Sequence, residues 1–160
     1  MPEDNRDDLR LWLRLLSCTN FIEYELQHRL REIFGISLAR FDFLAQLYRA
    51  GENELTMSAL GQRLMVTGGN ITGLTDRLAK DGHVARHPDP SDRRIQRICL
   101  TDQGRAFFEK MAVIHNQWIG EIFADVDSAS AGELQEMLTK LKTSAERAAD
   151  KRNAEKEQAS

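Results

Sequence analysis

Small hydrogen-bonding side chains, glycines and one arginine lie on one face of a helix predicted between residues 68 and 81. The opposite face is apolar, because Ile71, Leu74 and Leu78 recur at helical spacing. Glycines within a helix cost about 1 kcal/mol each relative to alanine, so we expect this backbone to approach another surface closely. Such a face suits the major groove of DNA. The residues expected to contact DNA from here are Thr67, Gly69, Asn70, Thr72, Gly73 and Arg77.

A second polar stretch, the loop 88–94, joins two segments with strand character, 83–87 and 95–100. Proline, aspartate and serine make this loop rich in turn-forming residues, and the flanking segments predict a β-hairpin. A short helix at 57–64, with Thr56 as its N-cap, a corner and the helix 68–81 precede it. Helix, turn, helix and hairpin in this order make a winged helix-turn-helix.

The tip of the predicted hairpin carries two adjacent arginines, Arg93 and Arg94. Guanidinium groups are costly to bury and suit DNA phosphates or a narrow minor groove. Asp92 is placed to orient Arg94, or a neighbouring arginine of the helix. We therefore expect these three residues to contribute to DNA binding.

Long helical patterns flank this central part. The segment 8–34 is apolar on more than one side, which in so small a chain predicts burial against a second subunit. Helix 38–50 follows, with Ser37 as its N-cap. Thr101 caps another long helix, and a capping box opens a last helix at Ser130.

The predicted fold class is mainly α with a small β-hairpin (α+β), in one domain spanning residues 1–160. Residues 38–101 form the winged helix-turn-helix lobe, whereas 8–34 and 102–150 form a helical dimerisation lobe. The charged tail 151–160 has no large apolar residue and is expected to be disordered.

These pieces resemble the MarR (multiple antibiotic resistance regulator) family of transcription factors. The resemblance is carried by the helix 66–78, by the loop 89–94 and by the sequence Leu-Thr-Asp-Gln-Gly at 100–104. It implies a homodimer in which the first, fifth and sixth helices intertwine across a two-fold axis. Two recognition helices would then reach successive major grooves of a pseudo-palindromic operator in double-stranded DNA.

The resemblance also implies an effector site between the dimer helices and the DNA-binding lobe. Three segments, 14–20, 38–42 and 65–70, are similar to a subset of the family that represses catabolism of aromatic acids. Members of that subset respond to the acids or to their coenzyme A thioesters. The candidate effector-binding residues are Cys18, Phe21, Ile22, Arg29, Arg31, Arg40, Phe41, Leu44 and His115. The arginines would bind a carboxylate or phosphates, although apolar residues at this spacing more often belong to an ordinary core.

Composition excludes several other classes. The segment 56–105 has eight Lys or Arg against five Asp or Glu, although the whole chain has a net charge of −3. Two cysteines are too few for a disulfide framework, and no apolar run approaches the length of a membrane span. We therefore expect a cytoplasmic protein with no membrane partner.

Neither catalytic nor metal-ligand motifs occur, and the four histidines are scattered. We expect no enzyme activity, no cofactor and no metal site, with His83 and His87 solvated or near phosphate.

Two alternatives stay open. Cys18 could make the protein an oxidant-sensing repressor, although no nearby base would activate its thiol and a buried, inert cysteine is the simpler interpretation. A purely structural helical protein would not need the basic hairpin tip.

Overall fold

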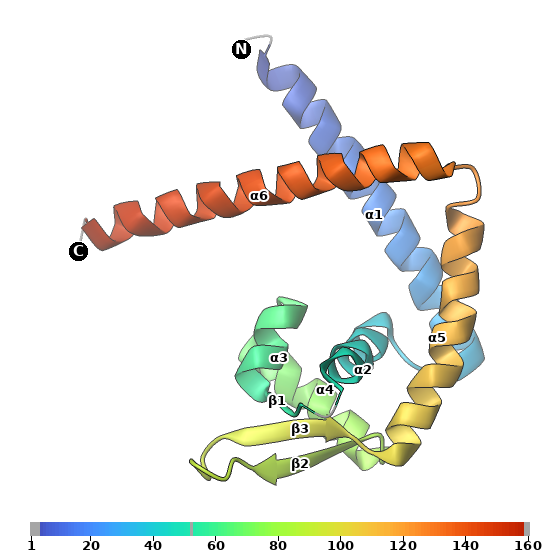
Figure 1. Cartoon of the computed structure of the whole chain (residues 1–160), viewed down its shortest axis with the longest axis vertical. Coiled ribbons are helices and arrows are strands. Elements are labelled where there is room, and N and C mark those ends of the chain that lie inside the picture. Colours follow the sequence, from blue (N-terminus) through green and yellow to red (C-terminus); the bar gives the residue numbers. More distant parts are fainter. Residues whose placement is uncertain (1–3, 52, 159–160) are drawn as a thin grey trace. The chain divides into compact units, whose positions relative to one another are not determined.

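The computed structural model describes residues 4–51 and 53–158 (Figure 1). The chain divides into two compact units, Met1–Ile119 and Gly120–Ser160. Over the described residues the elements are α1 (Asp4–Phe34), α2 (Leu38–Ala50), β1 (Leu55–Thr56), α3 (Met57–Leu64), α4 (Gly68–Lys80), β2 (Val84–Pro88), β3 (Gln96–Leu100), α5 (Asp102–Ile122) and α6 (Ser128–Gln158). This mainly helical chain with a small antiparallel sheet confirms the predicted fold class.

Hydroxyl side chains begin three of these helices at the predicted positions. Ser37 Oγ accepts a hydrogen bond from the backbone N–H of Arg40 at 3.3 Å. Thr56 Oγ1 accepts one from Ala59 N at 3.1 Å, and Thr101 Oγ1 accepts one from Gly104 N at 2.9 Å. Each bond satisfies a backbone donor that the first helical turn leaves unpaired.

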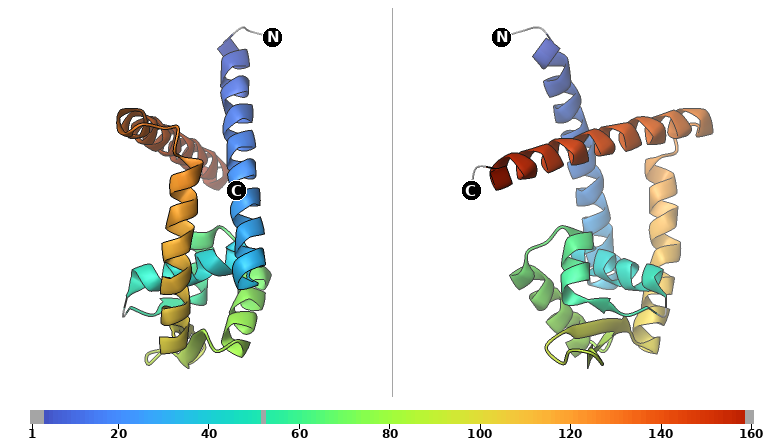
Figure 2. Two further views of the ribbon diagram at one scale, coloured as in Figure 1. Left: turned by 90° about the vertical axis from the view of Figure 1, so that its right-hand side faces the viewer. Right: turned by 60° about the vertical axis from the view of Figure 1, so that its left-hand side comes forward.

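The core of the first unit is centred on α2, whose Phe43 and Leu44 are completely buried. Leu30 of α1, Leu78 of α4 and Met111 of α5 are also completely buried. Edge-to-face contact of Phe34 with Phe107, at 6.3 Å between ring centroids, joins the end of α1 to the start of α5. Figure 2 shows these helices from two further sides.

The sheet has three antiparallel strands in the order β1-β3-β2. In Figure 1 it lies along one end of the first unit, with α2, α3 and α4 on one side. Ile98 on the central strand is completely buried, and Leu55 of β1 pairs with it. The sequence predicted only the hairpin β2–β3. A two-residue strand is too short for side-chain alternation to predict it.

Gly104, in the first turn of α5, touches the start of the hairpin. An ideal Cβ built at this position would lie 1.8 Å from the carbonyl oxygen of His83. Thr101 strengthens the same junction, because its hydroxyl donates a hydrogen bond to the carbonyl oxygen of Gly82 at 2.6 Å. Only glycine allows this approach of α5 to the backbone that leads into β2.

In the second unit, α6 begins two residues earlier than predicted. Asp127, rather than Ser130, is the capping residue: its Oδ1 accepts from Ser130 N at 2.9 Å and its Oδ2 from Ser130 Oγ at 3.0 Å. The predicted capping box at Ser130 is therefore wrong. These bonds lower the pKa of Asp127, the backbone N–H of Ser130 being the main cause.

The helix α6 continues to Gln158, through most of the segment 151–160 that we expected to be disordered. Alanine, lysine and glutamate favour helix, whereas the lack of large apolar side chains argues only against packing. Ala159 and Ser160 of this predicted tail lie outside the described residues, as do Met1–Glu3 at the other end. In the part of the chain described here, no helix is both long and apolar enough to cross a bilayer.

Candidate nucleic-acid interface

The helix α4 divides into a buried and an exposed face as predicted. Ile71, Leu74 and Leu78 are buried. Thr75 is also buried, which the sequence did not indicate, and its hydroxyl donates to the carbonyl oxygen of Ile71 at 2.7 Å. Gly73 is half-buried, and the exposed residues on and just before α4 are Thr67, Gly68, Gly69, Asn70, Thr72, Asp76 and Arg77.

The glycines of α4 are not required by packing within the chain. A Cβ built at Gly68, Gly69 or Gly73 would have no heavy atom of the described residues within 4 Å, apart from neighbouring and helix-backbone atoms. Packing among the described residues therefore does not explain these glycines. The backbone of α4 at these glycines is uncovered, so another molecule can approach it closely.

The start of α4 leaves hydrogen-bonding groups free for a ligand. Thr67 occupies the N-cap position with an extended backbone, but its side chain makes no capping hydrogen bond. The first N–H groups of a helix carry partial positive charge and attract anions such as phosphate. Beside them lies an open groove of about 620 Å³, lined by α3 and the first turns of α4.

At the tip of the hairpin, Asp92 holds Arg94 by three hydrogen bonds. Arg94 donates from Nε to Oδ1 at 3.1 Å, from Nη2 to Oδ2 at 2.9 Å and from its backbone N to Oδ1 at 3.0 Å. These bonds lower the pKa of Asp92 and raise that of Arg94. The Arg94 side chain is nevertheless 90% exposed, so it is oriented without being covered. Arg93 is also exposed.

Sequence reasoning missed Asp89, which organises the hairpin loop. It is buried and accepts hydrogen bonds from Ser91 N at 2.8 Å, Ser91 Oγ at 2.5 Å and Arg97 Nε at 2.5 Å. The Ser91 hydroxyl is the largest cause of a pKa held far below the usual carboxyl range. Asp-Pro-Ser-Asp is a turn signature that could have indicated this role.

A further unpredicted contact joins the two candidate DNA-binding elements. Asp76 on the exposed side of α4 forms an ion pair with Arg86 of β2. The pair links the recognition helix to the base of the hairpin, so the two elements are held by more than the apolar core.

Two of the apolar effector candidates lie inside the first unit. Phe41 and Leu44 are buried, and the ring of Phe41 stacks on His115 with centroids 4.4 Å apart. Burial lowers the pKa of His115. Phe41 and Leu44 therefore lie in the core, and the half-buried His115 packs against Phe41.

The α1 candidates are more accessible. Phe21 is 68% exposed on an open groove of about 530 Å³, which is lined by residues Leu13, Leu16, Ser17, Asn20, Phe21 and Tyr24. Ile22 is half-buried. Cys18 is exposed, which contradicts the buried position we expected for it.

Two of the three candidate arginines, Arg29 and Arg40, have acidic partners within the chain. Arg29 lies 3.9 Å from Glu25 and over the ring of Trp118. Arg40 forms an ion pair with Asp81, directly after α4, and Arg31 is exposed in the last turn of α1. No cavity found among the described residues is lined by all of the effector candidates, so their role stays a prediction.

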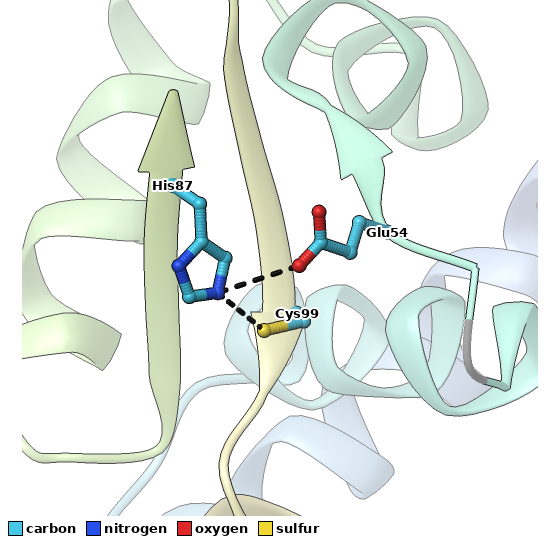
Figure 3. A group of neighbouring side chains, drawn as sticks. All are labelled: Glu54, His87 and Cys99. Atoms are coloured by element: carbon cyan, nitrogen blue, oxygen red, sulfur yellow. Dashed lines mark hydrogen bonds and ion pairs between the residues drawn. The ribbon is translucent and has the colours of Figure 1, made fainter. Parts of the chain in front are cut away.

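The sheet unites three side chains that sequence reasoning did not connect. His87 Nε2 lies 3.2 Å from Cys99 Sγ and 3.4 Å from Glu54 Oε1 (Figure 3). The sequence predicts only that His83 and His87 lie on the same strand. His83 instead stacks on Phe107 at 4.4 Å, and burial is the main cause of its lowered pKa, so the expectation that it is solvated is wrong.

Comparison with known proteins places these features in context. The sequence profile of the MarR family matches residues 34–95. The transcriptional activatory protein BadR of Rhodopseudomonas palustris is 34% identical over 118 residues, covering 72% of this chain and 67% of that protein. The HTH-type transcriptional repressor YetL of Bacillus subtilis is 30% identical over 133 residues, covering 83% of this chain and 79% of that one. A crystal structure of a MarR family transcriptional regulator from Silicibacter pomeroyi has 31% identity and a TM-score of 0.77, covering 91% and 99% of the two chains.

Proposed function

Because the chain belongs to the MarR family of transcriptional regulators, we propose that it is a homodimeric repressor that binds a pseudo-palindromic operator. In this proposal a small aromatic effector, an aromatic acid or its coenzyme A thioester, releases the DNA. Family membership assigns a transcriptional regulator rather than an enzyme. The operator arrangement, the repressing effect and the effector are the parts that we propose.

The observation that carries DNA recognition is the uncovered backbone of α4. Its glycines have open space where a side chain would be, and Asn70, Thr72 and Arg77 are exposed on the same helix. This surface would enter the major groove, where such side chains hydrogen-bond to base edges. Arg94, oriented by Asp92 and exposed, would reach the minor groove or its phosphates.

Exposed apolar side chains support a homodimer. In α1, Leu9, Leu11, Trp12 and Leu13 are each more than half exposed. Within the second unit, Met137 is 61% exposed and Leu138 and Leu141 each more than 40%. Apolar surface on this scale usually marks an interface, and a two-fold dimer presents two recognition helices to the two half-sites of a palindrome.

Repression rather than activation needs a direct test, because the related proteins include a named activator and a named repressor. A reporter gene placed behind the operator would be measured with and without the regulator. Lower expression in its presence supports repression, and higher expression contradicts it.

The proposed effector combines an apolar ring with negative charge, and Phe21 and the arginines of α1 and α2 are the residues proposed to bind it. An aromatic acid needs one cation, whereas a thioester carries several phosphates and needs more. A ligand shifts the equilibrium only if it binds the form released from DNA more tightly than the DNA-binding form. Operator binding should therefore be compared in the presence of aryl-coenzyme A, free aryl acid and coenzyme A alone.

DNA recognition itself is tested by titrating operator and unrelated DNA across a range of salt concentrations. Specific binding to the operator, with log affinity falling linearly with log salt, is expected for a protein that neutralises phosphates. A folded dimer without salt-dependent DNA binding would contradict the proposal. Cys18 makes no hydrogen bond or ion pair with other described residues, so no observation favours the oxidant-sensing alternative.

A further inference from the structure

The three-stranded sheet β1-β3-β2 carries three side chains of types that bind metals on the face opposite the buried Ile98. These residues are Glu54, His87 and Cys99 (Figure 3). Glu54 directly precedes β1, His87 lies on β2 and Cys99 on β3. One ligand atom from each residue lies within 4.8 Å of the other two. We propose that these three residues form a binding site for a divalent transition-metal ion, with zinc as the ion that suits it.

Strand pairing places these residues together. Leu55 pairs with Ile98, so Glu54 and Cys99 are the next neighbours along the antiparallel pair. Ala85 lies opposite Cys99, and His87 is two residues further along β2 on the same face. Ile98 points to the core on the other face, where it is completely buried. Because paired strands carry the ligands, the backbone holds them in place before an ion binds.

The distances suit a tetrahedral ion. With zinc bonds of about 2.0–2.3 Å, two ligand atoms lie about 3.3–3.6 Å apart. Here His87 Nε2 is 3.4 Å from Glu54 Oε1 and 3.2 Å from Cys99 Sγ. An ion would therefore need the imidazole and the thiol to separate by only a few tenths of an ångström, which side-chain rotation allows.

The donor set discriminates among metals. One imidazole nitrogen, one sulfur and one carboxylate oxygen are the ligand types of zinc, whereas calcium and magnesium prefer oxygen alone. Binding converts the Cys99 thiol to a zinc-bound thiolate: the S–H bond breaks, a Zn–S bond forms and the proton passes to solvent. Burial, followed by the charge of Glu54, raises the pKa of Cys99, which opposes loss of this proton, so zinc binding should weaken as the pH falls.

The Glu54 side of the cluster is open to solvent, since this side chain is 33% exposed. Glu54 also lines an open cavity of about 370 Å³ together with Asn53, Pro90 and Arg97. Zinc sites with three protein ligands complete their coordination with water, whereas structural sites usually have four protein ligands. An ion held in this way would cross-link β1, which leads into α3, to both strands of the wing.

Without a metal, the cluster is an ordinary hydrogen-bonded group in which His87 pairs with Glu54 and the Cys99 thiol is a weak partner. The absorption spectrum with cobalt(II) distinguishes the two interpretations. Cobalt(II) can replace zinc, and its absorption bands show whether a thiolate is bound to the ion. The full chain, stripped of metal by a chelator, would be titrated with zinc chloride in competition with a chromophoric chelator, and separately with cobalt(II).

We expect one zinc ion per chain and a cobalt spectrum with a thiolate-to-cobalt charge-transfer band and tetrahedral d–d bands. Cys99→Ser and His87→Ala should each weaken zinc binding at least about 100-fold, since even outer-shell partners of a metal contribute 10–100-fold. Matched controls remove the same residue types elsewhere: Cys18 and His28 are both exposed on α1. Cys18→Ser and His28→Ala should leave affinity and spectrum unchanged.

Zinc should also raise the melting temperature of the unaltered chain but not that of Cys99→Ser. Circular dichroism of the metal-free variants shows whether they fold. Loss of zinc binding in folded Cys99→Ser, with Cys18→Ser unaffected, supports the site. Absence of stoichiometric binding, a cobalt spectrum without the charge-transfer band, or binding that persists in Cys99→Ser would overturn it. These measurements involve no DNA, so failure here leaves the proposed regulatory function untouched.

Discussion

Arg40, in the first turn of α2, forms an ion pair with Asp81, the residue that directly follows α4. The arginine side chain is 16% exposed and that of Asp81 is 43% exposed. The pair joins the start of α2 to the end of the helix proposed to recognise DNA. Arg40 was proposed as a cation for an effector, yet its charge already has a partner within the chain.

This pairing gives Arg40 two separable roles. If Arg40 only anchors α4, then Arg40→Ala and Asp81→Asn should both lower the free energy of unfolding by about 1 kcal/mol and weaken operator binding alike. If Arg40 also binds an acidic effector, only Arg40→Ala should reduce release by aryl-coenzyme A. Urea unfolding and operator release, measured on both variants, distinguish the roles. Equal loss of release in both variants would remove Arg40 from the effector site.

Gly73→Ala should separate stability from DNA binding. Alanine stabilises a helix interior by about 1 kcal/mol relative to glycine, and its Cβ would meet no described atom within 4 Å. The same methyl group should collide with DNA, at about 1–3 kcal/mol for an overpacked contact. We therefore expect Gly73→Ala to raise the urea midpoint of unfolding and to lower the affinity for the operator by at least about tenfold.

Gly120→Ala is the matched control, because Gly120 lies in α5 and its added Cβ also meets no heavy atom of the described residues within 4 Å, apart from neighbouring and helix-backbone atoms. It should raise stability without reducing affinity for the operator. If Gly73→Ala binds the operator as tightly as the unaltered chain, α4 does not approach DNA closely at this position.

Arg94→Ala should weaken binding to operator and unrelated DNA by similar factors, because a phosphate or minor-groove contact carries little base information. The slope of log affinity against log salt should fall by about 1. Asp92→Asn should have a smaller effect in the same direction, since Arg94 keeps its charge but loses the hydrogen bonds that orient it. An unchanged salt slope in folded Arg94→Ala would rule out this contact.

Asp89 should make the free energy of unfolding depend on pH in the acidic range. Its pKa in the folded chain lies well below the ordinary value of 3.8, chiefly because the Ser91 hydroxyl donates to it, with the Ser91 backbone N–H and Arg97 adding to the effect. A lowered pKa means that the unfolded chain binds the proton more tightly. The contribution of Asp89 is therefore complete above about pH 3.8 and is lost as the pH falls towards the folded-state value.

Asp89→Asn should accordingly be less stable than the unaltered chain at neutral pH, and the difference should shrink in acid. Urea unfolding at a series of pH values down to about pH 2 measures this difference. Asp127, whose pKa is also lowered, is present in both proteins and cancels in the comparison. A difference that stays constant with pH would show that the carboxylate charge does not stabilise the loop.

Gly104→Ala should be the most damaging of the glycine substitutions proposed here. Its Cβ would lie 1.8 Å from the carbonyl oxygen of His83, so α5 and the hairpin would have to separate. Overpacking of this kind costs about 1–3 kcal/mol, against a gain of about 1 kcal/mol from helix propensity. We expect a lower urea midpoint and weaker operator binding. A variant as stable as Gly120→Ala would contradict the close contact.

The features that the sequence determined are local ones. Apolar spacing predicted the buried face of α4, and Ser37, Thr56 and Thr101 were identified as helix caps, because these signals act within a turn or two of the chain. The loop chemistry likewise predicted that Asp92 would orient either Arg94 or a neighbouring arginine of the helix, and it binds Arg94, two residues away. Family resemblance followed from the order of such local pieces. Local signals failed at the start of α6, where Asp127 rather than the predicted Ser130 is the cap.

Tertiary structure decided what depends on strand register and on contacts between distant residues. The short strand β1, the pairing of Arg40 with Asp81 and the contact of Gly104 with His83 each join residues that no local pattern relates. The same is true of Glu54, His87 and Cys99, which the sheet aligns from three separate segments. A shift of one residue in strand pairing would move one of these side chains to the opposite face. Only the folded register therefore brings them together.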